Sequence, residues 1–464
     1  MKLLTICNST IRYGSENHML RVACGLARQG VEVHAAFPRV DGTASMVRDC
    51  EAAQVSYWPF DLTGQFGSYP KDATVSPCLQ MLLLLNAVRP DVVQFTAAWP
   101  TYVWAPAWTC ALYNIPLLAV FQCASEVVYL PWLDLKQLAW ARRGPQRWMA
   151  VSQQNALALQ QTFGTRTGEI GILYNGIEID PATNVPGEAE TEALRREVRL
   201  ELGMPAGARL LMTTARLVPE KGHADLLQIM PRIIDEFPDV GCIWAGDGKE
   251  RHALETQVER LGLQQHVRVL GYRADIARLL RASDLFVFPS HIEGGCSAAI
   301  REAMLHQVPI VCSAAGGITE VVHDGSHALV FPVKDTDAML AQLSDALRYP
   351  AKMRALAERA RKRIEEFSSE RMVDDYLAVL RELCLAGGKM AGSRELRHAE
   401  PAEMLWERSC RADGSVELQP AGLTGTLQSE LLVDLLAAEQ KQYIKFLEEQ
   451  EEQIARLNRM QESP

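Results

Sequence analysis

The sequence predicts an α/β protein with two doubly wound domains in series, followed by a helical extension. The chain has 464 residues, about three times the roughly 150 typical of one domain. Short apolar strands alternate with helical patterns in two separate series, and a segment without this rhythm lies between them. Alternation of this kind predicts parallel sheets covered on both faces, which bind ligands at the carboxyl ends of their strands.

The first series covers residues 1–180. We predict its strands at residues 2–7, 31–37, 91–96, 116–122 and 148–152, and its helices at 15–29, 76–88, 100–113 and 153–163. Residues 92–125 contain no Asp, Glu, Lys or Arg, so a membrane span there is an alternative. Because Pro100, Pro106 and Pro116 interrupt that stretch, a strand, helix and strand are favoured.

A linker is predicted at 181–207, although it includes a charged helical stretch at 188–202. The second series then occupies 208–366, with strands at 209–214, 241–245, 267–270, 285–289, 309–312 and 328–331. A closing helix follows at 367–385. Residues 386–424 lack a clear period and predict another linker.

A long helix is predicted at 425–464. Its apolar stripe, spaced as in a coiled coil, comprises Leu436, Tyr443, Leu447, Ile454 and Leu457. One hypothesis is therefore a homo- or hetero-oligomer formed through residues 425–463. The alternative is an amphipathic helix lying on the body of its own chain.

Composition limits the functions open to the chain. Its 47 basic and 57 acidic residues give a net charge of −10, which disfavours a nucleic-acid partner held by a general basic field. The eleven cysteines form no CxxC pair and indicate neither a disulfide framework nor a zinc site. Since the apolar run at 1–7 is too short for a signal peptide, we expect a reducing, cytoplasmic location.

Arg216 and Lys221 form the first chemical signal. They lie five residues apart on a loop that connects a predicted strand to a helix. Both cations can therefore meet one anion near the helix start, where free N–H groups and the helix dipole also favour negative charge. The alternative is a solvated pair of surface cations.

The second signal lies between Pro289 and Met304, where a strand end, a glycine turn and a helix follow one another. Gly294 and Gly295 allow backbone N–H groups to approach a ligand closely. Glu293 and Glu302 place two carboxylates on this connection, and carboxylates suit sugar hydroxyls because they accept paired hydrogen bonds. The alternative is a helix with an ordinary capping glutamate.

Together these motifs resemble the retaining nucleotide-sugar glycosyltransferases of family 4. The matching order runs from Thr213 to Leu385 and comprises Ala215-Arg-Leu-Val-Pro-Glu-Lys-Gly222, Ala245-Gly-Asp-Gly248, Leu270-Gly271, Pro289-Ser290, Glu302-Ala-Met304 and Gly316-Gly-Ile-Thr-Glu320. The first half matches at Tyr13-Gly14-Ser15-Glu16, Ala150-Val-Ser152 and Tyr174-Asn-Gly-Ile177. The resemblance implies the GT-B fold, in which two Rossmann-like domains face each other and a closing helix returns to the first domain.

The resemblance also implies roles for particular residues. Arg216 and Lys221 would neutralise the diphosphate leaving group, Glu293 would contact the donor sugar, and Glu302 would bind the ribose. The implied donor-binding positions are Gly14, Ser15, Gln122, Gly271, Tyr272, Gly294, Gly295, Ser297, Ala298 and Glu302. The nucleotide sugar is a substrate, and neither a metal nor another cofactor is expected because the two cations do the work of a metal.

Two positions depart from the family pattern. Eight residues separate Glu293 from Glu302 where the family has seven, so the glycine loop is one residue longer. Gln122 occupies the place of a family histidine that contacts the donor sugar, and glutamine cannot carry that proton. A changed donor is the preferred explanation; a register error and lost catalysis are the alternatives.

The acceptor is expected on the first domain and would be a growing glycan or a lipid-linked saccharide. Trp132, Trp140 and Trp148 accompany Arg142, Arg143 and Arg147 in residues 135–148 and nearby, a composition suited to a peripheral contact on the inner face of the membrane. The alternative is core tryptophans with solvated arginines. Asp335 and Asp337 resemble a metal-binding pair, but their place before a helix indicates a cap.

We therefore expect a metal-independent, retaining sugar transfer from a nucleotide diphosphate. A hydrolase or phosphorylase on the same fold is the nearest enzymatic rival. From another class, the rival is a catalytically weak subunit that binds a partner through its C-terminal helix.

Overall fold

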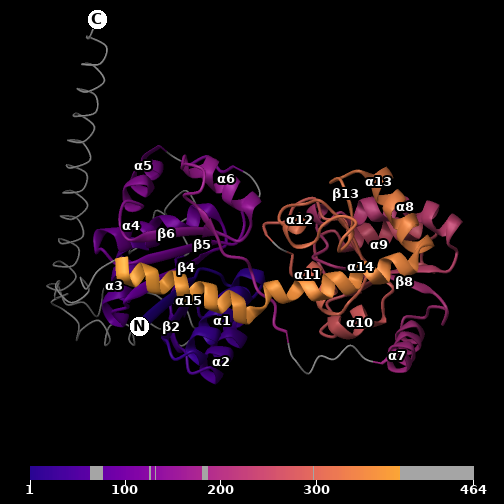
Figure 1. Ribbon diagram of the computed structural model, residues 1–464, viewed down its shortest axis with the longest axis horizontal. Helices are drawn as coiled ribbons and strands as arrows, with labels where there is room; N and C mark the ends of the chain where they lie inside the picture. The colour runs from indigo at the N-terminus through magenta and orange to yellow at the C-terminus, as the bar shows by residue number, and fades with distance from the viewer. Residues whose placement is uncertain (63–76, 125–126, 131, 180–186, 296, 387–464) are drawn as a thin grey trace, which may run out of the picture.

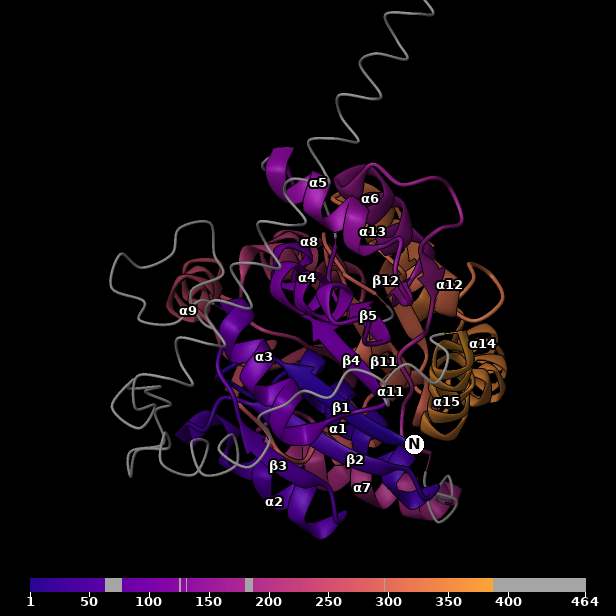
Figure 2. The ribbon, with the colours of Figure 1, turned by 90° about the vertical axis from the view of Figure 1, so that its left-hand side faces the viewer.

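The protein consists of two α/β lobes joined by two chain crossings. The computed structural model describes residues 1–62, 77–124, 127–130, 132–179, 187–295 and 297–386. Figure 1 shows the lobes side by side, with the final helices running from one to the other, and Figure 2 views the molecule end-on. The predicted linker at 386–424 and helix at 425–464 lie outside the described residues, apart from Ala386.

In the described part of the first lobe, parallel strands form one sheet in the order β3-β2-β1-β4-β5-β6-β7. The strands are β1 (Lys2–Cys7), β2 (Glu32–Phe37), β3 (Ser56–Pro59), β4 (Val92–Ala97), β5 (Leu117–Phe121), β6 (Gln146–Ala150) and β7 (Gly171–Ile172). The helices are α1 (Gly14–Arg28), α2 (Ala44–Ala52), α3 (Pro77–Val88), α4 (Trp104–Leu112), α5 (Trp132–Ala141) and α6 (Gln153–Phe163). Apolar side chains cover both faces of this sheet, which explains its nearly continuous apolar strands.

The charge-free stretch forms β4, α4 and β5, as the prolines predicted. No helix in the described residues is long and apolar enough to span the bilayer. The sequence prediction did not assign α2, β3, α5 or β7. β3 and β7 are the two edge strands of the sheet, and each pairs with a single neighbour.

The second lobe contains the order β10-β9-β8-β11-β12-β13, again with parallel pairing. The strands are β8 (Arg209–Thr214), β9 (Val240–Ala245), β10 (Val267–Gly271), β11 (Leu285–Phe288), β12 (Ile310–Ser313) and β13 (Leu329–Phe331). The helices are α7 (Glu188–Glu201), α8 (His223–Glu236), α9 (Arg251–Arg260), α10 (Ile276–Ala282), α11 (Ala298–Leu305), α12 (Ile318–Val321), α13 (Thr336–Arg348) and α14 (Pro350–Arg363). These arrangements confirm the predicted fold of two Rossmann-like domains.

The predicted linker at 181–207 is wrong for its larger part. Residues 187–207 belong to the second lobe, because α7 packs against α10, and Val198 of α7 joins Leu202 and Met204, just after it, in the core. Arg199 is 3% exposed and donates to the Asp284 carboxylate over 2.6 Å, which fixes α7 further. Most residues of α7 are charged, and only a narrow apolar face packs against the core, so the sequence pattern did not indicate that this helix belongs to the second lobe.

The closing helix crosses back to the first lobe as predicted. This helix, α15 (Ser369–Ala386), packs along α1 and contributes Met372, Tyr376 and Leu380 to the core of the first sheet. The approach is close at Gly25, where a Cβ atom would lie 2.4 Å from Cγ2 of Val373. Two turns earlier on α1, His18 shares a buried 2.6 Å hydrogen bond with Tyr376 of α15.

Candidate functional site

The predicted anion loop and the predicted glutamate loop meet at the carboxyl end of the second sheet. Lys221 follows β8, Glu293 follows β11, and these strands are neighbours. The Lys221 ammonium forms an ion pair with the Glu293 carboxylate, which also accepts a 2.8 Å hydrogen bond from Ser290 Oγ. The two side chains are 16% and 11% exposed, so the pair is well sheltered. Two of the three predicted catalytic residues are therefore in contact.

Backbone contacts hold these two loops together. Gly222 has φ +69°, and a Cβ atom there would lie 2.1 Å from the Pro289 carbonyl oxygen. The His291 amide donates to the Glu220 carbonyl over 2.8 Å, and the His291 ring bonds to the Asp225 carboxylate over 2.7 Å. The position of Lys221 relative to Glu293 is therefore set by the fold and not by their ion pair alone.

Arg216 stands on the same loop in a different environment. Its side chain is exposed, and it makes no hydrogen bond or ion pair with any residue that the structure describes. The backbone beside it is crowded, since a Cβ atom at Gly246 would lie 1.9 Å from the Ala215 carbonyl oxygen. The guanidinium is thus available to a ligand while its backbone is fixed.

The predicted base-binding residues lie farther along the same edge of the sheet. Gly271 ends β10, has φ +67°, and accepts a 2.8 Å hydrogen bond from the Gly246 amide. Tyr272 is 84% exposed. The order β10-β9-β8 therefore places these two residues two strands away from Arg216.

Helix α11 supplies the second carboxylate. Ser297 occupies its N-cap position without a side-chain capping bond, and Ala298 at the first helical position is exposed. Burial raises the pKa of Glu302, and the nearby Arg301 and Arg21 guanidiniums partly oppose that rise. Arg301 is 3% exposed and donates to the Asn175 carbonyl over 2.7 Å, which ties α11 to the first lobe.

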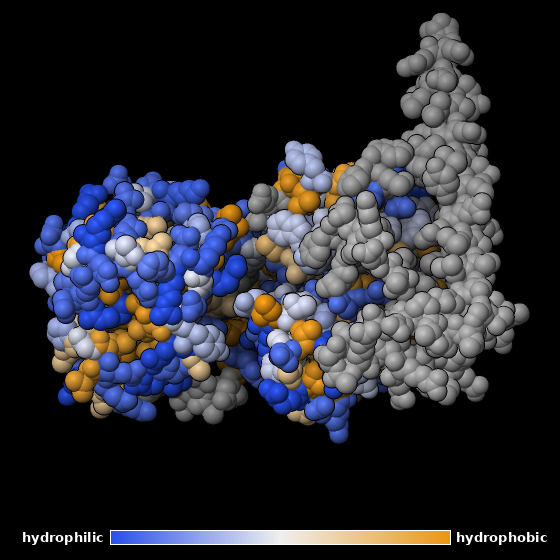
Figure 3. Space-filling model, turned by 180° about the vertical axis from the view of Figure 1, so that it is seen from behind, coloured by the Kyte–Doolittle hydropathy of each residue, from blue (hydrophilic) through white to orange (hydrophobic). Residues whose placement is uncertain are grey.

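The glycine loop packs directly on the first lobe. A Cβ atom at Gly294 would lie 2.9 Å from the Gln122 carbonyl oxygen, and one at Gly295 would lie 2.6 Å from Val151 Cγ2. Both glycines of this loop therefore lie against the opposite domain. Figure 3 shows the two lobes separated by a hollow on the face it presents.

Gln122 and Asn175 form a polar pair on the first lobe, and sequence reasoning missed Asn175. The Asn175 amide donates to Gln122 Oε1 over 3.0 Å. Gln122 Nε2 and Asn175 Oδ1 are buried and have no partner among the described residues. A ligand hydroxyl could satisfy both because it accepts one hydrogen bond and donates another. Asn175 lies inside the Tyr174–Ile177 segment that matches the family, and this match was the one sequence feature that could have identified it.

Gly14 and Ser15 begin α1 on the first lobe. Ser15 Oγ donates to Glu16 Oε1 over 2.6 Å, while Glu16 Oε2 accepts from the Tyr13 amide over 2.8 Å. Gly14 is exposed, and a Cβ atom at this position would have no other atom within 4 Å. These contacts stay within the first lobe, so the structure does not join the two residues to the Lys221 cluster.

The apparent metal motif is a helix cap, as predicted. Asp335 accepts a 2.9 Å hydrogen bond from the Ala338 amide at the start of α13. Asp337 pairs with Arg232 over 3.1 Å. Among the described residues, no group of His, Cys, Asp and Glu side chains is arranged to hold a metal ion.

The aromatic and basic segment is largely turned inward. Trp148 is 2% exposed with the Arg142 guanidinium 5.3 Å from its ring centroid, and Arg142 also pairs with Glu169 over 2.7 Å. Trp140 packs edge-on against Trp108. Trp148 is therefore part of the core, and Trp140 is half-buried.

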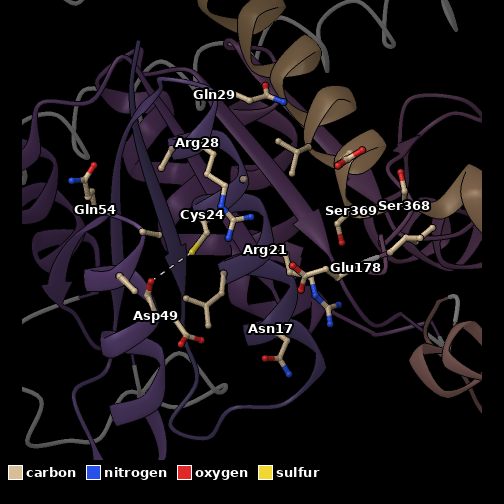
Figure 4. A pocket seen from close by; sticks show the side chains of 18 of the residues that line it. Asn17, Arg21, Cys24, Arg28, Gln29, Asp49, Gln54, Glu178, Ser368 and Ser369 are labelled. Atoms are coloured by element: carbon tan, nitrogen blue, oxygen red, sulfur yellow. Dashed lines mark hydrogen bonds between the residues drawn. The ribbon is translucent and has the colours of Figure 1, made fainter. Parts of the chain in front are cut away.

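A separate groove of about 1260 Å³ runs between α1, α2 and the start of α15 (Figure 4). It contains none of the predicted site residues. Two of its polar side chains are paired: Arg12 contacts Asp49 over 2.8 Å, and Gln29 donates to Asp374 over 2.7 Å. Arg21, Arg28, Glu178 and Glu370 also line the groove, so it carries charges of both signs.

Two family models cover most of the chain. Residues 13–181 match the model described as Glycosyltransferase Family 4, and residues 195–363 match Glycosyl transferases group 1. Each of the two lobes therefore matches a glycosyltransferase family model. The boundary between the models agrees with the structural finding that residues 195–207 belong to the second lobe.

Known proteins extend this likeness. The chain is 28% identical over 242 residues to spore coat protein SA of Bacillus subtilis (strain 168), covering 50% of this chain and 63% of the relative. It is 29% identical over 181 residues to N-acetyl-alpha-D-glucosaminyl L-malate synthase of Bacillus anthracis, covering 39% and 47%. The chain thus spans about half the length of these curated relatives.

Solved structures share the fold of this chain. The Anabaena protein HepE, solved in complex with UDP, superposes with a TM-score of 0.68 at 21% identity, covering 82% of this chain and 100% of that one. A glycosyltransferase from Rickettsia africae gives a TM-score of 0.69 at 17% identity, covering 82% and 98%. At these identities the likeness establishes the fold of the two lobes.

Proposed function

We propose that this protein transfers a sugar from a nucleotide diphosphate donor to an acceptor hydroxyl with retention of configuration. The observation that carries the proposal is the contact between Lys221 and Glu293, with the unpaired Arg216 on the same loop. This arrangement gathers two cations and a carboxylate at the carboxyl edge of a doubly wound sheet, where such folds bind ligands. UDP in the HepE structure supports a nucleotide donor.

The donor would enter with its diphosphate at Arg216 and Lys221. Lys221 already lies 3.5 Å from Ser290 Oγ and 3.4 Å from the Ile292 carbonyl oxygen, so its ammonium is oriented before the ligand arrives. The bond from the anomeric carbon to the leaving oxygen breaks, and its electron pair stays on the diphosphate. Two positive charges placed at that oxygen lower the barrier without a metal.

The acceptor hydroxyl would form the new bond on the face that the diphosphate leaves. Its proton passes to the departing phosphate oxygen, so atoms and charges balance and no enzyme nucleophile is required. Gln122 and Asn175 would hold a hydroxyl of the donor sugar through their unpartnered atoms. Glu302 would hold the ribose, and the acceptor, a glycan or a lipid-linked saccharide, would approach from the first lobe.

The decisive experiment begins with the full chain and a thermal-shift screen of UDP-, GDP-, ADP- and CMP-sugars, because a ligand that binds the native state raises its melting temperature. Turnover of the stabilising donor is then measured with saccharide acceptors, with and without EDTA, and the anomeric configuration of the product is read by NMR. Arg216→Ala should reduce turnover by about 100-fold or more. Arg232→Ala is the control, since Arg232 forms an exposed ion pair with Asp337.

Normal turnover in Arg216→Ala would contradict the proposed site, and an inverted product would contradict retention. A donor that is hydrolysed at the same rate with and without every acceptor would favour the hydrolase alternative. Loss of activity in EDTA that returns with a divalent cation would contradict metal independence.

The peripheral membrane contact remains a proposal and would rest on basic side chains, because the described tryptophans of the segment are packed. Arg143 and Arg147 are exposed. A flotation assay with anionic vesicles tests it on wild type and on an Arg143→Ala, Arg147→Ala variant. Wild type that stays in the soluble fraction would contradict the contact.

A further inference from the structure

Glu320 reaches from the second lobe to the first. It lies in α12, at the end of the Gly316–Glu320 motif, to which the sequence assigned no role. Its carboxylate accepts hydrogen bonds from the Gln153 amide over 2.9 Å, the Gln154 amide over 3.3 Å and the Tyr174 hydroxyl over 3.0 Å. All three donors belong to the first lobe.

The Glu320 carboxylate lies at the N-terminus of helix α6, which favours negative charge. Gln153 and Gln154 are the first residues of α6, an eleven-residue helix, and their N–H groups have no acceptor within that helix. The helix dipole adds partial positive charge at this end. Glu320 therefore satisfies two N–H groups of one domain with a charge held by the other.

The same helix end carries the contact to the glycine loop of the site. Ser152, the N-cap residue of α6, donates to the Gly294 carbonyl over 3.3 Å. A Cβ atom at Gly317 would lie 2.8 Å from Cβ of Ser152, so the glycine pair before α12 also packs on this point. Glu320 and Gly294 of the second lobe therefore both contact the start of α6.

Glu320 and Tyr174 are each held in place close to the two points where the chain crosses between the lobes. The chain crosses between the lobes at Ile177 and at Ser368, which lie side by side as an isolated parallel bridge. On the second lobe, Arg363 donates to the Glu320 carbonyl over 3.0 Å. On the first lobe, the Tyr174 ring packs edge-on against Phe367, which precedes the Ser368 crossing, with ring centroids 5.5 Å apart.

We propose that Glu320 is an interdomain latch, a positioning residue whose carboxylate holds the start of α6 and so keeps the lobes closed with Gly294 against Gln122. A rotation about the Ile177–Ser368 crossing would separate the carboxylate from the two amides and withdraw the glycine loop from the first lobe. The catalytic consequence rests on the proposed function. The closure itself does not.

The test compares Glu320→Ala with Asp335→Ala in the full chain. Both variants remove a carboxylate that caps a helix, but Asp335 caps α13 within its own lobe. Small-angle X-ray scattering without nucleotide should give a larger radius of gyration for Glu320→Ala and a wild-type value for Asp335→Ala. Tyr174→Phe, which removes one of three hydrogen bonds, should give a smaller change in the same direction.

In kinetics, Glu320→Ala should raise the donor KM by about tenfold, because closure would have to be driven by donor binding. Saturating donor should restore most of kcat, which a general loss of structure would not allow. If Glu320→Ala is unstable, Glu320→Gln removes the charge while keeping the acceptor oxygen, and the same two readouts apply.

Unchanged scattering in Glu320→Ala would overturn the latch. A larger radius of gyration together with an unchanged donor KM in Glu320→Ala would show that closure of the lobes does not affect donor binding. Because scattering is measured without any substrate, a wild-type protein that turns over no nucleotide sugar would refute the proposed function and leave the latch to be judged separately.

Discussion

Replacing Lys221 by alanine should lower both the turnover rate and the stability of the protein, to different extents. The position of the ammonium and the burial of its ion pair allow the size of each effect to be estimated. In Lys221→Ala the charge at the leaving oxygen is lost, and the absence of one such stabilising group lowers kcat by about 10²–10³-fold. The variant also leaves the Glu293 carboxylate, 11% exposed, without its cation. An exposed pair contributes about 0–1 kcal/mol, and removing one partner of a buried pair costs about 3–5 kcal/mol. Because the burial of this pair lies between those two cases, we expect Lys221→Ala to lose about 2 kcal/mol of stability.

A second substitution separates the two effects. In the Lys221→Ala, Glu293→Ala double variant the stranded carboxylate is gone, so stability should recover by about 1 kcal/mol while turnover stays low. Urea denaturation and initial-rate kinetics measure the two quantities. Lys352→Ala is the control, because Lys352 pairs with Asp345 at an exposed site, 49% and 32% exposed, and should change stability by less than about 1 kcal/mol.

Two results would refute this reasoning. Turnover within about fivefold of wild type in Lys221→Ala would mean that the ammonium does not meet the leaving group. A double variant less stable than either single variant would mean that the two side chains contribute independently, against the ion pair seen in the structure.

Three other perturbations follow from burial. Because the folded pKa of Glu302 lies above its ordinary value of 4.5, the ionised form costs stability once the pH exceeds 4.5. Urea denaturation of Glu302→Gln should show it more stable than wild type at pH 7 and no different at pH 4; an equal difference at both pH values would contradict the assigned cause. Burial lowers the pKa of His18 from 6.5 to about 3, so wild type should lose stability as the pH falls from about 6.5 toward 3. His18→Gln should flatten that slope in pH-dependent unfolding, and an unaltered slope would point to another group. Gly25→Ala should cost about 1–3 kcal/mol, exceeding the gain of about 1 kcal/mol from helix propensity, because Val373 has no room for the methyl group; a higher melting temperature would contradict that packing.

The sequence predicted elements well where strand and helix signals were strong. β8 and α6 coincide with the predicted ranges, since an apolar run before a turn and a Ser152 cap define their ends. α2 and β3 were missed because a nine-residue helix and a four-residue edge strand carry little periodic signal. α7 was assigned to a linker because most of its residues are charged and only Val198 and its neighbours face the core.

At the site, the sequence predicted which residues carry functional groups but not which of them contact one another. Lys221 and Glu293 were each recognised by residue type and position, and the structure added that they are paired. The Glu320 carboxylate and the Asn175 carbonyl each accept a hydrogen bond from the opposite lobe, and neither residue has a sequence neighbour that reveals its partner. Such contacts arise only when the domains are placed together, so local pattern carries no signal for them.

The return of α15 to the first lobe also sets an order of assembly during synthesis. Leu3, Val22 and Leu118, from the first third of the chain, share a core with Met372, Tyr376 and Leu383. A ribosome must therefore complete the whole second lobe before the first can bury that face. Until then the nascent first lobe presents an apolar surface along α1, which makes it a target for chaperones. The domain that is translated first is the one that finishes folding last.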